Sequence, residues 1–346
     1  MTGLKNSYSH TYATMQRAAV DLSLSENPLG PSPKATEAII NAAGVLHLYP
    51  DEEKTLIALL ARHYNIAEDS ILLGAGANQL LEDYLKVFAL NKSIVVPSAT
   101  FPESVACMDT LNGSVRIVPL HCDLSLNLDA LRKTCTSDTA LIHLCNPNNP
   151  TGIWTECSQL LELAELSPVP LLISEAGADF VGKTIINPSL HPNIIVVRSF
   201  SKAHGLAGLR IGYSIASSEK ISQMKSSLRS YRVSSLAISA AIAALQDQEH
   251  LQKSIAYILQ EKTWLMNEMR ALDFKVIPSQ GQTFIAQVPS KFGNANRFCS
   301  IAKQYDMAVV NCSLYSGLDQ YIRISPQKHA INKKFILILK KIQGGK

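Results

Sequence analysis

The chain has 346 residues, of which 47% are hydrophobic and 17% are charged, and its formal net charge is +4. This hydrophobic content can bury a large core, which excludes an intrinsically disordered chain. Lys and Arg are dispersed along the sequence and form no stripe or tail, so we expect neither nucleic acid nor an acidic membrane surface as a partner.

The cysteines and the N-terminus both favour a cytoplasmic protein. The seven cysteines occur singly, without a CxxC pair, in a chain too long to need disulfides for its stability. Residues 1–20 hold no long apolar run behind basic residues, and no run of about eighteen uncharged apolar residues occurs in the sequence. We therefore expect no export signal and no membrane-spanning segment.

The expected elements begin after a segment at 1–33, which is rich in Pro and Ser and is predicted to form an arm over the body. From 34 to 246, short apolar runs alternate with longer amphipathic runs, a pattern typical of strands and helices around a largely parallel sheet. The expected helices include 52–64, 79–90 and 157–165. The expected strands are 70–73, 93–96, 114–118, 140–144, 170–174, 193–197 and 210–214.

The pattern changes after residue 246. A long helical stretch at 248–272 precedes the short runs FKVIPS, TFIAQV, MAVV and YIRIS, which are interrupted by one helix and followed by another. The sequence therefore predicts an α/β fold with a large, mostly parallel-sheet domain at 34–246. A small α+β domain is expected at 247–346.

The stretch VVRSFSKAHGLAGLRIGYS, at 196–214, carries the strongest chemical signal. An apolar strand leads into Ser199, Ser201 and Lys202, and a glycine-rich turn then leads to Arg210. Burial and nearby positive charge lower the pKa of a lysine, which frees its amine to form an imine with an aldehyde such as pyridoxal 5'-phosphate (PLP). An isolated Ser-Lys pair would more simply lie in a surface turn, but the serines and the arginine beside it can bind a phosphate.

Two further turns follow apolar strands. In ILLGAGANQLLEDYL, the backbone amides at the start of the helix can face a phosphate, although glycines in such a turn also serve conformation alone. In LIHLCNPNNPTG, a buried strand ends in a Pro-rich turn, and turns of this kind usually just reverse the chain. Neither turn is specific by itself.

The two motifs NPNNPTG and SFSKAHGLAGLRIGY together resemble the aminotransferase class I/II family of fold type I PLP-dependent enzymes. Within that family, the segments DLSLSENPLGPSPKA, LYPDEEKTLIALLARHY and LLGAGANQLLE are most similar to histidinol-phosphate aminotransferases and threonine-phosphate decarboxylases. The resemblance covers 21–340 and implies a PLP cofactor, a small amino-acid substrate and a homodimer with shared active sites.

The resemblance also implies roles for individual residues around the cofactor. Lys202 would hold PLP as a Schiff base and move the proton at the substrate Cα. Asn149 would bind the ring hydroxyl, and Phe101 would stack on the ring. The phosphate would be held by Gly76, Ala77, Asn78, Ser199, Ser201 and Arg210.

Four more residues are implied at the edges of the site. Tyr49, in the LYP motif, would reach the phosphate bound by the neighbouring subunit. Arg323 would grip the substrate α-carboxylate as a two-pronged ion pair. Asn27 and Gly30, in the ENPLG segment, would bind substrate.

The sequence departs from the family at its Asp-Glu-x-Tyr motif, which here reads Ser-Glu-Ala-Gly. Ser174 replaces the aspartate that pairs with the pyridine nitrogen, and Gly177 replaces the tyrosine that bonds the ring hydroxyl. Without the carboxylate, the pyridine nitrogen stays unprotonated and the ring is a weaker electron sink, so ordinary transamination should be slow. Ser174 would instead donate a hydrogen bond to a neutral pyridine. Asp179 can compensate only if the chain follows a different path.

Three functions therefore remain open. The first is an aminotransferase-like enzyme that acts at the α-amino group of a small amino acid, either phosphorylated or not. The second is a PLP-dependent decarboxylase or a β/γ-eliminating lyase, and the third is a non-catalytic PLP-binding paralogue. The decarboxylase pattern itself is incomplete, because His10 is followed by Thr11 where that enzyme has glycine, and Val310 and Asn311 replace its Arg-Asp pair. His204 is interpreted as a packed turn residue, and no metal site is proposed.

Overall fold

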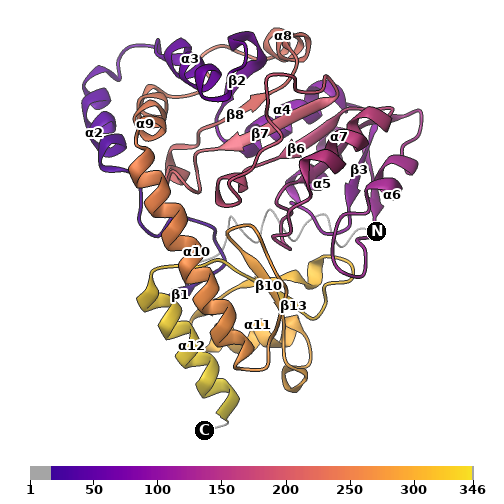
Figure 1. The fold of residues 1–346 in the computed structure, drawn as a ribbon, viewed down its shortest axis with the longest axis vertical. Helices are drawn as coiled ribbons and strands as arrows, with labels where there is room; N and C mark the ends of the chain where they lie inside the picture. Colours follow the sequence, from indigo (N-terminus) through magenta and orange to yellow (C-terminus); the bar gives the residue numbers. More distant parts are fainter. Residues whose placement is uncertain (1–16, 345–346) are drawn as a thin grey trace.

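The computed structural model describes residues 17–344, and its larger part is built around one seven-stranded sheet (Figure 1). The strand order is β2-β8-β7-β6-β5-β3-β4; β8 is antiparallel to both of its neighbours and every other pair is parallel. The strands are β2 (Ile71–Gly74), β3 (Ser93–Pro97), β4 (Ser114–Val118), β5 (Thr139–Cys145), β6 (Leu171–Ser174), β7 (Ile194–Ser199) and β8 (Gly212–Ile215). All seven expected strands are present, with ends that differ by at most two residues from the prediction.

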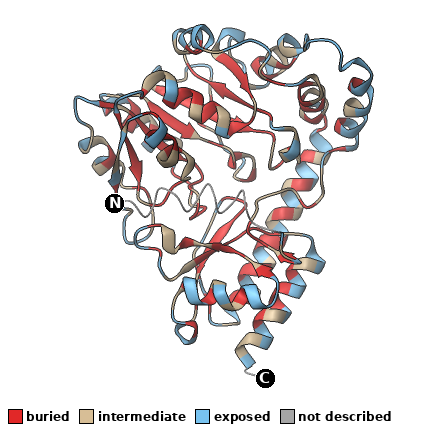
Figure 2. Cartoon of the chain, turned by 180° about the vertical axis from the view of Figure 1, so that it is seen from behind, coloured by how far each residue is buried: buried red, intermediate tan, exposed pale blue. Residues whose placement is uncertain are grey.

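Helices cover both faces of this sheet, because successive strand side chains point to opposite faces. Leu73 packs into the core with α2, α3, α6, α7 and α9, whereas its neighbour Leu72 packs into the opposite core with α4, α5 and α8. Figure 2 shows the resulting buried sheet beneath helices whose outer faces are exposed. These helices are α2 (Pro33–Ala42), α3 (Glu53–Tyr64), α4 (Ala77–Phe88), α5 (Glu103–Thr110), α6 (Leu128–Lys133), α7 (Cys157–Leu166), α8 (Ser218–Ser227) and α9 (Ser235–Gln246).

The smaller part is a four-stranded antiparallel sheet, in the order β12-β13-β10-β9, packed with three helices. Its core contains the fully buried rings of Phe284, Phe298 and Phe335. The long helix α10 (Gln248–Arg270) runs into it from the larger part (Figure 1). The other elements are β9 (Lys275–Val276), β10 (Phe284–Gln287), α11 (Ala295–Gln304), β11 (Met307–Ala308), β12 (Val310–Asn311), β13 (Tyr321–Ile324) and α12 (His329–Gly344).

The described part of the predicted arm packs into the smaller part. Strand β1 (Val20–Asp21) pairs in parallel with β11, and Val20 and Leu22 are fully buried in the same core as Phe284. The chain then reaches the larger part at Asn27. Two apolar side chains therefore make this segment a component of the core, where the Pro- and Ser-rich composition had indicated a surface arm. The departure from the decarboxylase pattern at His10 and Thr11 lies outside the described residues.

Within residues 17–344, no helix is both long enough and apolar enough to cross a membrane. The carboxyl ends of the parallel strands β5, β6 and β7 point toward the smaller part, and the turns that follow them meet there. The edge at which parallel strands end is where ligands usually bind in α/β folds.

Candidate active site

A cavity of about 320 Å³ lies at this edge, between the two parts of the molecule. The turns after β2, β5, β6 and β7 form one side of it. The other side is formed by the loop before β10, by strand β13 and by the segment at 24–26. Ten of the predicted site residues line this cavity: Ala77, Asn78, Phe101, Asn149, Ser174, Ser199, Ser201, Lys202, Arg210 and Arg323.

Lys202 lies in the turn after β7, which ends at Ser199, and lines the cavity. Burial, together with the smaller effect of the positive charge of Arg323, lowers the pKa of its amine to about 8. A substantial fraction of the amine is therefore neutral just above neutral pH. An unprotonated amine can attack an aldehyde, so the environment of Lys202 suits imine formation.

The start of α4 and Arg210 form a cradle for an anion beside this amine. Gly76 precedes α4 with φ +91° and provides no side-chain cap, so the first-turn amides of the helix remain available. A Cβ atom on Gly76 would lie 2.5 Å from Nη2 of Arg210, which shows how closely the guanidinium approaches this turn. Nη1 of Arg210 donates to Oγ of Ser201 over 3.4 Å, and the Ser199 hydroxyl accepts from the Ser201 amide over 3.1 Å. This donor set fits the phosphate of PLP, with an amine beside it that fits the aldehyde.

A second cationic group, Arg323, enters from β13. Its Nη1 donates to Oδ1 of Asn149 over 2.7 Å, and its Nη2 donates to the backbone oxygen of Ser23 over 2.6 Å. These bonds join the smaller sheet, the turn after β5 and the N-terminal segment at one point. The guanidinium is thereby held in place at the cavity, where it can bind an anionic group of a substrate.

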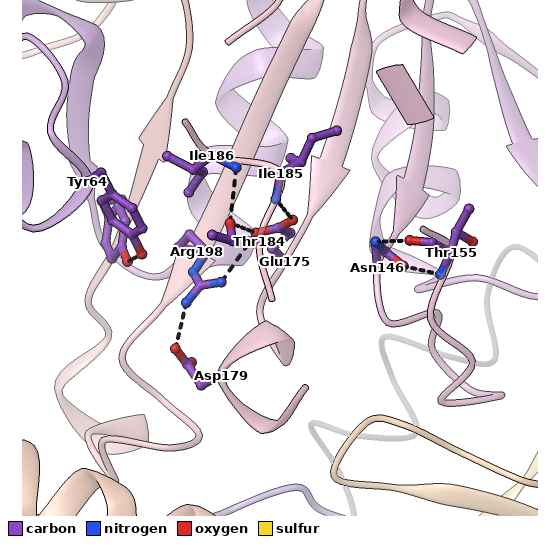
Figure 3. Close-up of polar contacts among 10 residues, drawn as sticks. Tyr64, Asn146, Thr155, Glu175, Asp179, Thr184, Ile185, Ile186 and Arg198 are labelled. Atoms are coloured by element: carbon purple, nitrogen blue, oxygen red, sulfur yellow. Dashed lines mark hydrogen bonds and ion pairs between the residues drawn. The ribbon is translucent and has the colours of Figure 1, made fainter. Parts of the chain in front are cut away.

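Ser174 and Gly177 both line the cavity, at the end of β6 and in the turn that follows. Asp179 does not line it and cannot serve as the missing carboxylate, because its carboxylate accepts from Nη2 of the buried Arg198 over 2.5 Å (Figure 3). Nη1 of Arg198 donates to Glu175 over 3.3 Å, and the Glu175 carboxylate also accepts from the Ile185 amide. Asp179 therefore belongs to a buried ion cluster with Arg198 and Glu175.

Four predicted site residues are not among those that line the cavity: Gly76, whose turn lies against Arg210, and Tyr49, Asn27 and Gly30. Tyr49 is 76% exposed and stacks on Tyr231, with ring centroids 4.6 Å apart. Asn27 uses its side chain within the chain, donating to the backbone oxygen of Ala203 over 2.9 Å and accepting from the Leu29 amide. The carbonyl of Gly30 bonds the ring of His250 over 3.2 Å. Asn27 thus holds the backbone beside Lys202 and Gly30 contacts α10, and the binding of substrate by these two residues stays a prediction.

His204 is a packed residue, in agreement with the sequence-based interpretation. Its ring lies 4.9 Å from that of Phe200, and burial lowers the pKa of the imidazole. Other cavity residues carried no signal in the sequence, among them Glu26, Glu103 and Gln282. Glu26 precedes the ENPLG residues to which roles were assigned, Glu103 begins α5 and Gln282 lies in the loop before β10, so only their position in the folded chain brings them together. Burial raises the pKa of the Glu103 carboxyl.

Comparison with known proteins agrees with this geometry. The model of the family described as aminotransferase class I and II matches residues 17–336. A histidinol-phosphate aminotransferase from Anaeromyxobacter sp. is 33% identical over 281 residues, which are 79% of this chain and 77% of that protein. The histidinol-phosphate aminotransferase of Sinorhizobium meliloti, solved in complex with pyridoxal-5'-phosphate, superposes with a TM-score of 0.85 at 25% identity. That comparison covers 98% of this chain and 93% of the other.

The fold is also that of the L-threonine-O-3-phosphate decarboxylase from Porphyromonas gingivalis, with a TM-score of 0.80 at 24% identity over 94% of this chain and 99% of the other. At that identity the likeness concerns the fold alone. The family match spans nearly the whole described chain, and a lysine and an anion cradle meet in one cavity. The chain belongs to the aminotransferase class I and II family and is a PLP-dependent enzyme.

Proposed function

We propose that this chain is an aminotransferase that acts on a histidinol-phosphate-like amine, with Lys202 as the catalytic residue. The observation that carries the proposal is the meeting of Lys202, the cradle at Gly76 and Arg210, and the cation of Arg323 in one cavity. When bound, PLP supplies an aldehyde for the amines and a conjugated ring that stabilises negative charge at Cα. Relatives named histidinol-phosphate aminotransferase support the substrate class.

Each group of the site has a distinct task in this proposal. Lys202 holds the cofactor through its amine and carries the proton that leaves the substrate Cα. Ser199, Ser201 and Arg210 bind the cofactor phosphate together with the amides of Ala77 and Asn78. These tasks require side chains and amides at fixed positions, and each of these residues lies near the end of a strand or the start of a helix.

The remaining tasks concern the ring and the substrate. Phe101 stacks on the ring of the cofactor, Asn149 donates to its hydroxyl, and Ser174 donates to its nitrogen. Arg323 binds the anionic group of the substrate, because its guanidinium is held at the cavity wall by Asn149 and the Ser23 carbonyl. The amide nitrogen of Asn149 has no other partner among residues 17–344, which leaves it a donor for a bound group.

The experiment is reconstitution of the purified chain with PLP. We expect an absorption band near the visible edge, and borohydride treatment followed by peptide mass spectrometry should locate the trapped cofactor on Lys202. The K202A variant should lose both. A wild-type protein that shows no band and no trapped lysine would refute the assignment. Amino-group transfer from histidinol phosphate to a 2-oxo acid then tests the substrate.

A second function, a decarboxylase or an eliminating lyase, is favoured by the environment of the ring nitrogen. Ser174 is uncharged, and Asp179, the aspartate that follows it in the same turn region, is engaged by Arg198. A ring without a paired carboxylate is a weaker electron sink. The S174D variant distinguishes the two functions: a large gain in transamination indicates a wild type adapted to other chemistry, whereas brisk transamination by the wild type contradicts the electronic argument.

We further propose a cytoplasmic homodimer in which Tyr49 contacts the phosphate bound by the other subunit. Tyr49 is exposed and so are the nearby side chains of Ile40, Leu46 and Leu48, which supports an interface on this surface. Mixing K202A and Y49A subunits tests this: sites with both residues intact form in mixed dimers, so activity should exceed that of either variant alone. Activity that stays at the sum of the two refutes the shared site.

A further inference from the structure

Gln282 lines the cavity, and its side chain has no hydrogen-bond partner among the described residues 17–344. It belongs to the loop between β9 and β10, its side chain is 7% exposed, and it lines the cavity beside Gly177. A primary amide carries two donor hydrogens and an acceptor oxygen, all of which a bound molecule can use. The polar end of Gln282 is therefore available to a molecule bound in the cavity.

The loop that carries Gln282 is held firmly in place. The buried Lys262 donates to the backbone oxygens of Ser279 and Gly281 over 2.9 and 2.6 Å. On the opposite side, the Gln280 and Gly281 amides donate to the Gly152 carbonyl over 3.1 and 3.0 Å. The loop of the smaller part is thus joined to the turn after β5, and the backbone that carries Gln282 is held at the cavity.

Gln282 fills the space that a side chain at position 177 would need. A Cβ atom on Gly177 would lie 2.5 Å from Oε1 of Gln282, which is closer than such atoms approach in proteins. Any side chain at 177 would therefore displace the amide. Glycine at 177 and glutamine at 282 are complementary: one removes a side chain from the turn after β6, and the other brings an amide to the same place.

We propose that Gln282 makes the polar contact to the bound cofactor that no side chain at position 177 can make. The inference rests on the proposed function, since it assumes a cofactor held by Lys202. An amide N–H that donates to an oxygen of the cofactor stabilises negative charge on that oxygen. It therefore favours the deprotonated form of the cofactor bound to Lys202 and lowers the pKa of its absorption band. Because the amide comes from the smaller part, the position of that part also affects the bound cofactor.

The test is a pH titration of the absorption band of the cofactor bound to Lys202. Q282A should raise its pKa by about 0.5 to 1 unit because a donor is lost, and Q282E should raise it further because a negative charge favours the protonated form. G177A should act like Q282A, since the new methyl group displaces the amide. The G177A/Q282A double variant should shift the pKa no more than either single variant, as expected for two changes that act on one contact.

Q280A is the matched control, because Gln280 lies in the same loop but its Oε1 accepts from the Trp154 amide outside the contact in question. It should leave the pKa of the band unchanged, and thermal melting of each variant excludes misfolding as the cause. Unchanged titration in Q282A and Q282E, with only a raised KM for the amine, overturns the inference and assigns Gln282 to the substrate. Absence of any band in the wild type instead refutes the proposed function.

Discussion

Replacing Asp179 with asparagine separates a structural carboxylate from a catalytic one. Nη2 of Arg198 donates to this carboxylate over 2.5 Å, and both side chains are largely buried. In D179N, the amide keeps a hydrogen-bond acceptor of nearly the same shape and loses only the charge. Arg198 retains its ion pair with Glu175, so the cluster stays assembled. We therefore expect a less stable protein with an unaltered active site.

The magnitude follows from the type of bond that is changed. A hydrogen bond to a charged partner contributes about 1.5–3 kcal/mol and a neutral bond about 0.5–1.5 kcal/mol, so D179N should cost about 1–2 kcal/mol of the free energy of unfolding. For domains of about 150–250 residues, each kcal/mol shifts the thermal midpoint by about 2–4 °C, and larger chains shift less. We expect the midpoint to fall by about 2–5 °C.

The assay measures the thermal midpoint, the absorption band with PLP and the rate of amino-group transfer on the same preparations. E268Q is the control, since Glu268 pairs with Lys340 on the surface over 3.2 Å, and exposed pairs contribute at most about 1 kcal/mol. The reasoning is refuted if D179N keeps its midpoint but loses activity or alters the band. That result would place Asp179 at the cofactor nitrogen in the working enzyme.

Two further predictions concern the cation near the lysine and the anion cradle. Arg323 lowers the pKa of Lys202, so R323Q should raise that pKa above about 8. The pH dependence of covalent cofactor attachment, measured by stopped flow, should then move to higher pH. A pH profile identical to that of the wild type would contradict this. G76A should raise the dissociation constant of PLP at least about tenfold, because the methyl group displaces Arg210 and the residue must keep a φ of +91°. Equilibrium dialysis measures it, with G44A as the control because a Cβ on Gly44 meets no atom within 4 Å. Equal affinities for G76A and G44A would refute the cradle.

The strands and the phosphate cradle could be predicted because they depend on residues close together in the sequence. Ser199, Ser201 and Lys202 follow one apolar strand, so strand geometry alone brings them to the same end of the sheet. The glycine at 76 precedes a helix, and a helix start offers its amides wherever it lies. Apolar runs likewise determined which segments enter the sheet, although not that β8 would run antiparallel to both neighbours.

The roles of Asn27 and Gly30 could not be obtained in this way. Both occur in a motif that resembles the family pattern, which indicates that they matter but not what they touch. In the structure Asn27 bonds the backbone of Ala203, and Gly30 bonds His250. These partners lie far away in the sequence, so a motif near the N-terminus contains no information about them.

The sequence by itself determined that this chain is an α/β protein, and it predicted a reactive lysine, a phosphate-binding turn and an altered ring-binding motif at Ser174 and Gly177. Each of these features is encoded within a few consecutive residues, where backbone geometry fixes the relative positions of the side chains. Only the tertiary structure decided that Arg198 engages Asp179 and that Gln282 fills the space beside Gly177. Such contacts join segments of different loops and domains, and their distances depend on how the whole core packs.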